Sequence, residues 1–217
     1  VGWNDSGDDG FFVWGNGVFS NKEWIKPNEF GIIEYDGEFY YIPSCSQANE
    51  NNNDPIVQNM KMYEYVPDDT VNMYDFLSLV DDVFAENGLI TVSFGIATIF
   101  RDIIFGSTSY FPLLFIFGPN MTGKTTLAKN AMLLFMKNSQ MTNIGSSSFA
   151  GLSRLLSMLS NMPVLLNEYF DTVGLKKIDM FKGIFEGTGR IMSSENNDSF
   201  TQFTAKCSLI LTGQDLP

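Results

Sequence analysis

A run of residues that could bind a phosphate chain lies near the middle of the sequence. Gly118, Gly123, Lys124 and Thr125 follow the pattern G-x-x-x-x-G-K-T directly after the apolar segment 111–117. Because glycines let the backbone approach closely, the turn can direct several N–H groups at phosphate oxygens, and the positive end of the following helix adds to the attraction. The spacing therefore predicts a P-loop. Its nucleotide-binding residues would be Gly118, Pro119, Asn120, Met121, Thr122, Gly123, Lys124, Thr125 and Thr126.

Two side chains of this loop have separate expected roles. Lys124 would bind the β and γ phosphates, and the Thr125 hydroxyl would bind Mg²⁺. The flanking pattern supports this prediction, because 111–117 has the composition of a buried strand and an apolar stripe at helical spacing follows the loop. The stripe consists of Leu127, Ala128, Ala131, Leu134 and Phe135. We therefore expect ATP and Mg²⁺ as ligands.

A second candidate position is Glu168, near the end of the apolar run 162–169. A carboxylate at the end of the strand beside the P-loop strand can polarise the attacking water and hold Mg²⁺ through its hydration shell. Asn167 stands where an acidic residue is usual, and it could still bind the metal or accept a hydrogen bond, with one charge fewer. The alternative is that Glu168 is a surface residue that follows a buried strand.

A third apolar run, 208–212, predicts another core strand that ends in polar residues. The amide of Gln214 could hydrogen-bond both the γ-phosphate and the attacking water. Thr212 competes with it for that role. Lys124, Glu168 and Gln214 are therefore the predicted catalytic residues, and Thr125, Asn167 and Glu168 the predicted metal-binding ones.

Several classes of chemistry are excluded by residue content. The chain has no histidine, and its cysteines, Cys45 and Cys207, form no C-x-x-C pair. A His-ligated zinc site and a Ser-His or Cys-His nucleophile are thereby excluded within this chain, and two buried free thiols in a cytoplasmic protein are expected. The longest apolar stretch, 88–105, contains Arg101 and Asp102, which indicates a buried helix and no membrane span.

The net charge of −12 is distributed unevenly. Residues 1–110 hold 4 Lys+Arg against 18 Asp+Glu, whereas residues 111–217 hold 9 against 7. The second half is therefore mildly basic, and a polyanion such as DNA could approach it without meeting the repulsion that the average implies.

The N-terminal segment has the pattern of short strands. Asp36-Gly37 lies between two β-rich runs, which predicts a hairpin whose two-residue turn needs positive φ at both positions. Residues 1–45 should be rich in β-structure. Aromatic side chains here could stack on bases, but core packing is the commoner role; they are Trp3, Trp14, Trp24 and Tyr40.

The polar stretch 46–54 is the expected boundary of this segment. Apolar spacing predicts one helix that starts at Asp69 or Thr70 and stops at Gly88, then a second over 90–104; Ser146 or Ser147 should cap a later helix. The expected organisation comprises three parts: a β-rich unit over 1–54, a helical lead-in over 55–110, and an ATPase core over 111–217. Since the chain starts at Val1 and stops just after a core strand, we expect a fragment of a longer protein.

The order of four motifs resembles a known family. They are the P-loop at 118–125, Leu-Leu-Asn-Glu at 165–168, a Gly-rich segment at 182–190, and Leu-Ile-Leu-Thr-Gly-Gln-Asp-Leu-Pro at 209–217. Over 88–217 the chain resembles superfamily three helicases. It is more specifically similar to the AAA+ helicase part of primase-helicase proteins of phages and mobile elements, especially of gut Bacteroides-type bacteria. The family's third motif ends in Asn, a hydrophobic residue and Pro, where this chain has Gln214-Asp-Leu-Pro.

This resemblance implies an α/β fold, a P-loop NTPase of AAA+ type with a parallel sheet and flanking helices. It also implies a homo-oligomeric ring, ATP-driven unwinding of single-stranded or forked DNA during replication, and no membrane partner. A β-hairpin over 189–206 would enter the ring channel, with Lys182, Arg190 and Lys206 as DNA-binding candidates beside the acidic Glu195 and Asp198. The family's arginine finger would lie beyond Pro217, so the fragment alone would hydrolyse ATP poorly. An ATPase switch without DNA coupling and a non-hydrolysing nucleotide-binding module are the alternatives.

Overall fold

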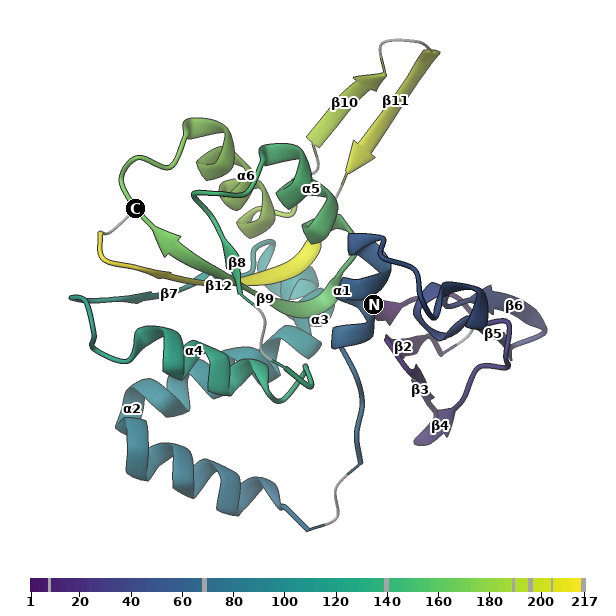
Figure 1. Cartoon of the computed structure of the whole chain (residues 1–217), viewed down its shortest axis with the longest axis horizontal. Helices are drawn as coiled ribbons and strands as arrows, with labels where there is room; N and C mark the ends of the chain where they lie inside the picture. Colours follow the sequence, from purple (N-terminus) through teal and green to yellow (C-terminus); the bar gives the residue numbers. More distant parts are fainter. Residues whose placement is uncertain are drawn as a thin grey trace. The chain divides into compact units, whose positions relative to one another are not determined.

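The structure is a computed structural model, and it describes residues 1–7, 9–67, 70–138, 141–188, 190–194, 197–203 and 205–215; over 190–203 it describes the backbone only. The chain forms two compact units (Figure 1). The N-terminal unit comprises Val1–Asp69 and Phe135–Asn138, and the C-terminal unit comprises Thr70–Leu134 and Ser139–Pro217. The division therefore differs from the three expected segments, because the helices after residue 70 belong to the same unit as the C-terminal strands.

The N-terminal unit is rich in β-structure, as predicted. An antiparallel meander is followed by a separate hairpin, and Phe11, Val18 and Ile33 are buried between them. Asp36 and Gly37 have φ values of 55° and 77°, so the predicted hairpin turn is confirmed. The elements are β1 (Gly2–Asn4), β2 (Phe11–Trp14), β3 (Gly17–Ser20), β4 (Glu23–Ile25), β5 (Ile32–Tyr35), β6 (Glu38–Tyr41), η1 (Pro43–Cys45), η2 (Gln47–Asn49) and α1 (Pro55–Met62).

The polar stretch 46–54 is an integral part of this unit. Asn49 donates to the Pro43 carbonyl and to the Tyr41 hydroxyl, and the Asp54 side chain caps α1 by accepting from the Ile56 N–H. These hydrogen bonds satisfy the polar side chains locally, which is why the stretch does not act as a linker. The expected boundary at 46–54 is therefore wrong, and α1 belongs to the N-terminal unit.

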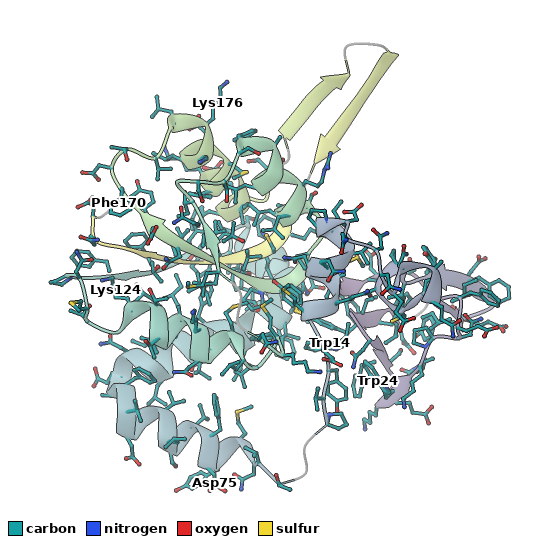
Figure 2. The ribbon with its side chains drawn as sticks, viewed as in Figure 1. Trp14, Trp24, Asp75, Lys124, Phe170 and Lys176 are labelled. Atoms are coloured by element: carbon teal, nitrogen blue, oxygen red, sulfur yellow. The ribbon has the colours of Figure 1, made fainter. Side chains whose placement is uncertain are left out.

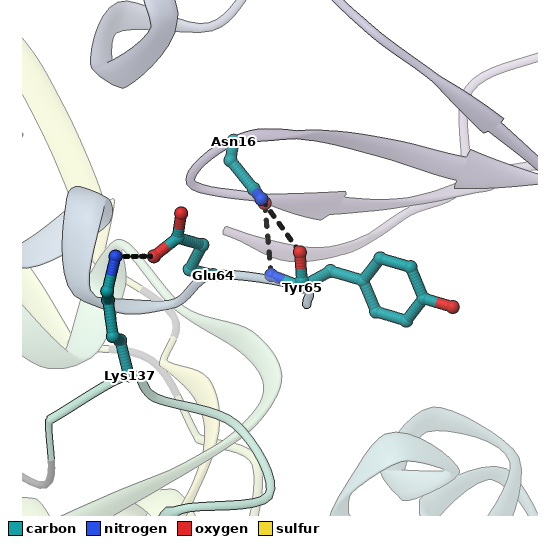
Figure 3. Close-up of polar contacts among 4 residues, drawn as sticks. All are labelled: Asn16, Glu64, Tyr65 and Lys137. Atoms are coloured by element: carbon teal, nitrogen blue, oxygen red, sulfur yellow. Dashed lines mark hydrogen bonds and ion pairs between the residues drawn. The ribbon is translucent and has the colours of Figure 1, made fainter. Parts of the chain in front are cut away.

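The segment after α1 is hydrogen-bonded to the β-meander through the backbone of Tyr65. The Asn16 amide donates to the Tyr65 carbonyl at 2.8 Å and accepts from the Tyr65 N–H at 3.0 Å (Figure 3). Lys137 forms an ion pair with Glu64 at 3.3 Å in the same unit. Trp14 and Trp24 pack on the Tyr65 ring, with centroids 6.0 and 4.9 Å away. These aromatic side chains therefore have a structural role in the unit.

The C-terminal unit contains a parallel sheet in the order β8-β9-β12-β7. The sequence predicts that the Glu168 strand, β9, lies beside the strand before the G-x-x-x-x-G-K-T turn, β7, but β12 lies between them. The reason is visible in burial: residues 207–213 of β12 are all buried, as a strand covered on both faces requires. The strands are β7 (Leu114–Phe117), β8 (Thr142–Asn143), β9 (Ser160–Tyr169) and β12 (Lys206–Gly213).

Helices cover both faces of this sheet. In Figure 1, α2 and α4 lie on one side of it, and α5 and α6 lie on the other. This arrangement confirms a mixed α/β unit with a parallel sheet and flanking helices. The helices are α2 (Met73–Ile99), α3 (Arg101–Thr108), α4 (Lys124–Met132), α5 (Phe149–Ser157) and α6 (Leu175–Phe185). The antiparallel strands β10 (Arg190–Ser194) and β11 (Asn197–Phe203) form the hairpin that was expected between α6 and β12.

Helix boundaries differ from the sequence expectation in three places. α2 consists of two helical segments that meet at Ala85, which has φ 50° and ψ −145°, so the predicted division into two helices is present but lies three residues before Gly88. A Cβ at Gly88 would lie 2.7 Å from the Phe84 and Val80 side chains, so this glycine permits close packing and does not end the helix. Asn72 caps α2 in place of Asp69 or Thr70, and Ser148 caps α5 in place of Ser146 or Ser147.

The long apolar stretch forms parts of two helices. Arg101, at the start of α3, is buried; it donates to the Ile184 carbonyl at 2.8 Å and lies over the rings of Phe105 and Phe111. Burial lowers the pKa of this guanidinium. Within the described ranges, no single helix has the length and apolar content needed to cross a bilayer; α2 and α3 reach them only jointly, and they meet at 87°.

Both cysteines are free thiols, as expected, but they differ in burial. Cys207 is fully buried in β12, and burial raises the pKa of its thiol to about 12. Cys45 is half-buried and donates to the Gly15 carbonyl. The expectation of two buried thiols is therefore correct for Cys207 only.

Candidate functional site

The G-x-x-x-x-G-K-T segment forms a turn between β7 and α4. Gly123 has φ 83° and ψ 5°, a left-handed conformation that favours glycine, and it precedes the first residue of α4, Lys124. The predicted helix start near Gly123 is therefore confirmed. Leu127 donates its N–H to the Gly123 carbonyl, which is the first regular hydrogen bond of α4. The N–H groups of the helix residues before Leu127 have no acceptor within the helix. Such groups at the positive end of a helix can bind an anion.

Two side chains fold back over this turn. The Lys124 Nζ atom donates to the Pro119 carbonyl at 2.5 Å, and the Thr122 hydroxyl donates to the same oxygen at 2.9 Å. The turn is also attached to the neighbouring strand, because the Gly118 N–H donates to the Gly213 carbonyl at 3.4 Å. The ammonium group of Lys124 is thus held against the Pro119 carbonyl of the turn.

One cavity of about 440 Å³ gathers most of the predicted site. It lies where the turn meets the carboxyl ends of β9 and β12. Figure 2 labels Lys124 and Phe170, which both line it. Of the predicted nucleotide, metal and catalytic residues, only Gly118 and Pro119 are not part of its lining, which consists of residues 120–126, Asn167, Glu168, Tyr169, Phe170, Thr212, Gly213 and Gln214.

Asn167 connects the three elements that form this cavity. Its Oδ1 atom accepts a hydrogen bond from the Thr125 hydroxyl at 3.2 Å and another from the Thr212 hydroxyl at 2.5 Å. Since each hydroxyl donates its proton to Asn167, the lone pairs of the Thr125 oxygen remain available for a cation. Thr212 is buried near the end of β12, and its hydroxyl donates to Asn167.

Glu168 is exposed at the end of β9, and its backbone is left-handed, with φ 63°. Its Oε2 atom accepts a hydrogen bond from the Asn143 amide. Asn143 ends β8 and lies directly opposite Asn167 in the parallel register. Asn143 was not among the residues predicted from the sequence. The signal that could have identified it is a polar residue that ends a short strand next to the Glu168 strand.

Gly213 sets the shape of the cavity wall beside Gln214. A Cβ at this position would lie 2.8 Å from the Tyr169 carbonyl and 3.0 Å from the Phe115 ring, so β12 and β9 can approach closely here only with glycine. Gln214, the next residue, is exposed and lines the cavity. Its side chain is therefore placed among the predicted phosphate-binding groups, as expected from its position after the strand.

The oxygen ligands that the site offers fit a hard cation. Mg²⁺ prefers oxygen, keeps several waters, and usually takes one or two protein ligands together with phosphate oxygens. Thr125, Asn167 and Glu168 supply hydroxyl, amide and carboxylate oxygens within the one cavity. Across the part of the chain that the structure describes, there is no group of three or more His, Cys, Asp or Glu that could hold a metal ion. These oxygens therefore fit Mg²⁺ that arrives with phosphate and not a protein-only metal cage.

The DNA-binding candidates lie outside this cavity. Lys182 is exposed on α6, and Lys206 is exposed at the start of β12. Arg190 begins β10, and its side chain is outside the described residues, as are those of Glu195 and Asp198. The three basic positions therefore flank or begin the β10–β11 hairpin.

Comparison with known proteins finds structural similarity to a helicase. No protein-family model matches the chain, and no curated protein matches it. The chain is similar in structure to "SCCmec type IV Cch - active helicase", with 20% sequence identity and a TM-score of 0.47. The match covers 72% of this chain and 29% of that protein, so the chain spans less than a third of its length.

Proposed function

We propose that this chain binds ATP with Mg²⁺ and hydrolyses it, as the motor domain of a DNA helicase of the primase-helicase type. One observation carries the ATPase part of this proposal. Thr125, Asn167, Glu168 and Thr212 meet in a single cavity beside the G-x-x-x-x-G-K-T turn, at the carboxyl ends of parallel strands. Ligands of open α/β sheets bind at that edge.

The residues of the turn would bind the triphosphate. Backbone N–H groups of the turn and the first residues of α4 would donate to phosphate oxygens, and Lys124 would exchange its bond to Pro119 for the β and γ phosphates. Mg²⁺ would neutralise the negative charge that develops on the phosphate oxygens. Thr125 would hold it directly, and Asn167 would support Thr125 by accepting its hydroxyl hydrogen bond, since both lone pairs of Oδ1 already accept hydrogen bonds.

Glu168 would act as the base that orients and activates the attacking water. Its carboxylate is exposed to the cavity, and one of its oxygens is fixed by Asn143 while Oε1 remains to accept a proton. Gln214 would donate to the γ-phosphate from the other side. Thr212 would hold the Asn167 side chain in the orientation in which it accepts the hydrogen bond from the Thr125 hydroxyl.

The neutral Asn167 is compatible with metal binding in this geometry. Asn167 is required to accept a hydrogen bond from the Thr125 hydroxyl, and an amide oxygen accepts hydrogen bonds as a carboxylate does. It lacks a negative charge, however, so each bond is weaker than with a carboxylate. This observation favours the second candidate function, a nucleotide-binding module that hydrolyses slowly or not at all.

The DNA part of the proposal rests on the motif order and on charge. The half of the chain that contains the site is mildly basic, and a hairpin projects from the C-terminal unit between α6 and β12 (Figure 1). Lys182, Arg190 and Lys206 would contact the DNA backbone, and a ring of subunits would supply the arginine finger. An ATPase switch would share the nucleotide site and lack this contact.

ATP hydrolysis with and without single-stranded DNA tests the proposal. The complete protein that contains this chain would be compared with Lys124→Ala and with Lys129→Ala, which removes a lysine from the same helix outside the cavity. We expect DNA-stimulated hydrolysis that Lys124→Ala abolishes and Lys129→Ala preserves. Hydrolysis that depends on Lys124 and is indifferent to DNA would favour the switch. Binding of Mg·ATP without hydrolysis would favour the module.

A further inference from the structure

Lys177 connects α6 to the strand beside the candidate catalytic glutamate. Its Nζ atom donates to the Ile144 carbonyl at 2.6 Å, a contact between residues 33 positions apart. Ile144 is fully buried, and its own N–H donates to the Asn167 carbonyl at 2.9 Å. The peptide groups on both sides of Ile144 are therefore held, one by α6 and one by the site. A charge-assisted bond of this kind is stronger than a neutral one.

Asn143 precedes Ile144 and belongs to a compact turn. Its Oδ1 atom accepts from the Ser146 N–H at 3.0 Å, and its carbonyl accepts from the Ser147 hydroxyl at 2.6 Å. The same side chain donates to Glu168. Because these bonds fold residues 143–147 as one unit, a displacement of Ile144 also displaces the amide that fixes the Glu168 carboxylate.

The other end of α6 leads to the β10–β11 hairpin. Thr188 donates its N–H to the Gly183 carbonyl at 2.8 Å, and β10 begins two residues later. A cavity of about 320 Å³ is lined by residues of both α5 and α6 at this place, with Gly183, Thr188 and Ala205 in its wall. Since packed helices can slide past one another by small shear movements, we expect a force on the hairpin to shift α6.

We propose that Lys177 is a positioning residue that couples α6, and through it the hairpin, to the Glu168 carboxylate. This inference rests on the proposed ATPase function and names a control point of that same site. Glu168 has three rotatable side-chain bonds and an exposed position, so its orientation depends on Asn143. Asn143 in turn depends on the peptide that Lys177 holds. Lys177 itself touches neither phosphate nor water in this scheme.

Two lysines in succession provide a matched comparison. Lys177 is half-buried and bonded to the Ile144 carbonyl, whereas Lys176 is exposed and lines the cavity beside α5. Lys177→Met removes the ammonium group and keeps an apolar stem of similar length, and Lys176→Met removes the same charge from the adjacent position. Lys177→Arg keeps a donor, and it should retain most of the coupling if the bond to Ile144 is the cause.

The test measures kcat, KM and DNA stimulation of the complete protein. For Lys177→Met we expect kcat to fall about tenfold, since a small misplacement of a catalytic group costs this much or more, while KM changes less than twofold. DNA stimulation should fall in parallel, and Lys176→Met should match the wild type. The variant Asn143→Ala should lower kcat as well, and adding Lys177→Met to it should change nothing further, because both act through Glu168.

Different outcomes separate this inference from the proposed function. Wild-type hydrolysis that requires Lys124, together with equal kcat for Lys177→Met and Lys176→Met, would overturn the role of Lys177 and leave the ATPase standing. Additive losses in the Asn143→Ala double variant would overturn it too. A loss of thermal stability in Lys177→Met that Lys177→Arg fails to restore would assign the lysine a structural role. Absence of any Lys124-dependent hydrolysis would remove both proposals.

Discussion

Replacement of Asn167 by Asp is the most informative single change in the candidate site. Asn167 Oδ1 accepts from Thr125 at 3.2 Å and from Thr212 at 2.5 Å, so a carboxylate oxygen of the same size would take over both bonds without rearrangement. The substitution adds one negative charge next to the Thr125 oxygen that is proposed to bind Mg²⁺. We therefore expect Asn167→Asp to make nucleotide affinity more dependent on Mg²⁺.

The magnitude follows from the added charge. The two hydrogen bonds are present with and without nucleotide, so their gain cancels in the binding free energy. A carboxylate attracts the cation by about 1 to 2 kcal/mol when solvent separates the two charges. This attraction corresponds to Mg·ATP binding that is about tenfold tighter. Without Mg²⁺ the added charge repels the phosphates, and ATP affinity should fall below that of the wild type.

Fluorescence titration with a nucleotide analogue, in excess Mg²⁺ and in excess chelator, measures both affinities. Gln214→Glu is the control, because it adds the same charge to the same cavity at a position other than that of the Thr125 and Thr212 acceptor. This control should weaken binding under both conditions. Equal or weaker Mg·ATP binding by Asn167→Asp would refute the role given to Oδ1. Tighter binding without faster hydrolysis would show that the amide does not limit turnover.

Four further outcomes follow from individual contacts. Gly213→Ala should destabilise the protein by about 1 to 3 kcal/mol, measured by thermal unfolding, because its Cβ would lie 2.8 Å from the Tyr169 carbonyl. Asn16→Ala should cost about 1 to 3 kcal/mol in urea unfolding, because it leaves both backbone groups of Tyr65 without the bonds that Asn16 supplies. Cys207 should resist thiol reagents at pH 8 until the protein unfolds, because it is fully buried and its pKa is raised to about 12. Calorimetry should detect Mg²⁺ binding only when ATP or an analogue is present.

The elements that the sequence predicted correctly are those encoded by local pattern. The Asp36-Gly37 turn, the strand before the P-loop motif and the start of α4 at Gly123 each depend on residues within a few positions of one another. Gly88 shows the limit of this approach. A glycine after an apolar stripe commonly ends a helix, but here it accommodates side chains from the preceding turns of a helix that continues past the break at Ala85.

The order of the strands could not be read from local pattern. The runs that became β9 and β12 are both apolar and buried, and either could have paired with β7. Long-range packing decides which strand pairs with β7, and it places β12 between β9 and β7. Asn143 was missed for the same reason: its contact with Glu168 depends on the pairing of a two-residue strand, β8, with the end of β9.

The charge of the cavity explains how a neutral residue can serve at position 167. Among the described residues that line it, Glu168 is the one acidic side chain and Lys124 the one basic side chain. A single exposed carboxylate attracts a divalent cation weakly, so in the proposed complex most of the charge that retains Mg²⁺ would come from the phosphates themselves. Under that condition the residue beside Thr125 needs only an acceptor oxygen, which the amide of Asn167 supplies. The same neutrality reduces repulsion on Glu168, which leaves the position of its carboxylate to Asn143 and to the contacts that hold Asn143 in place.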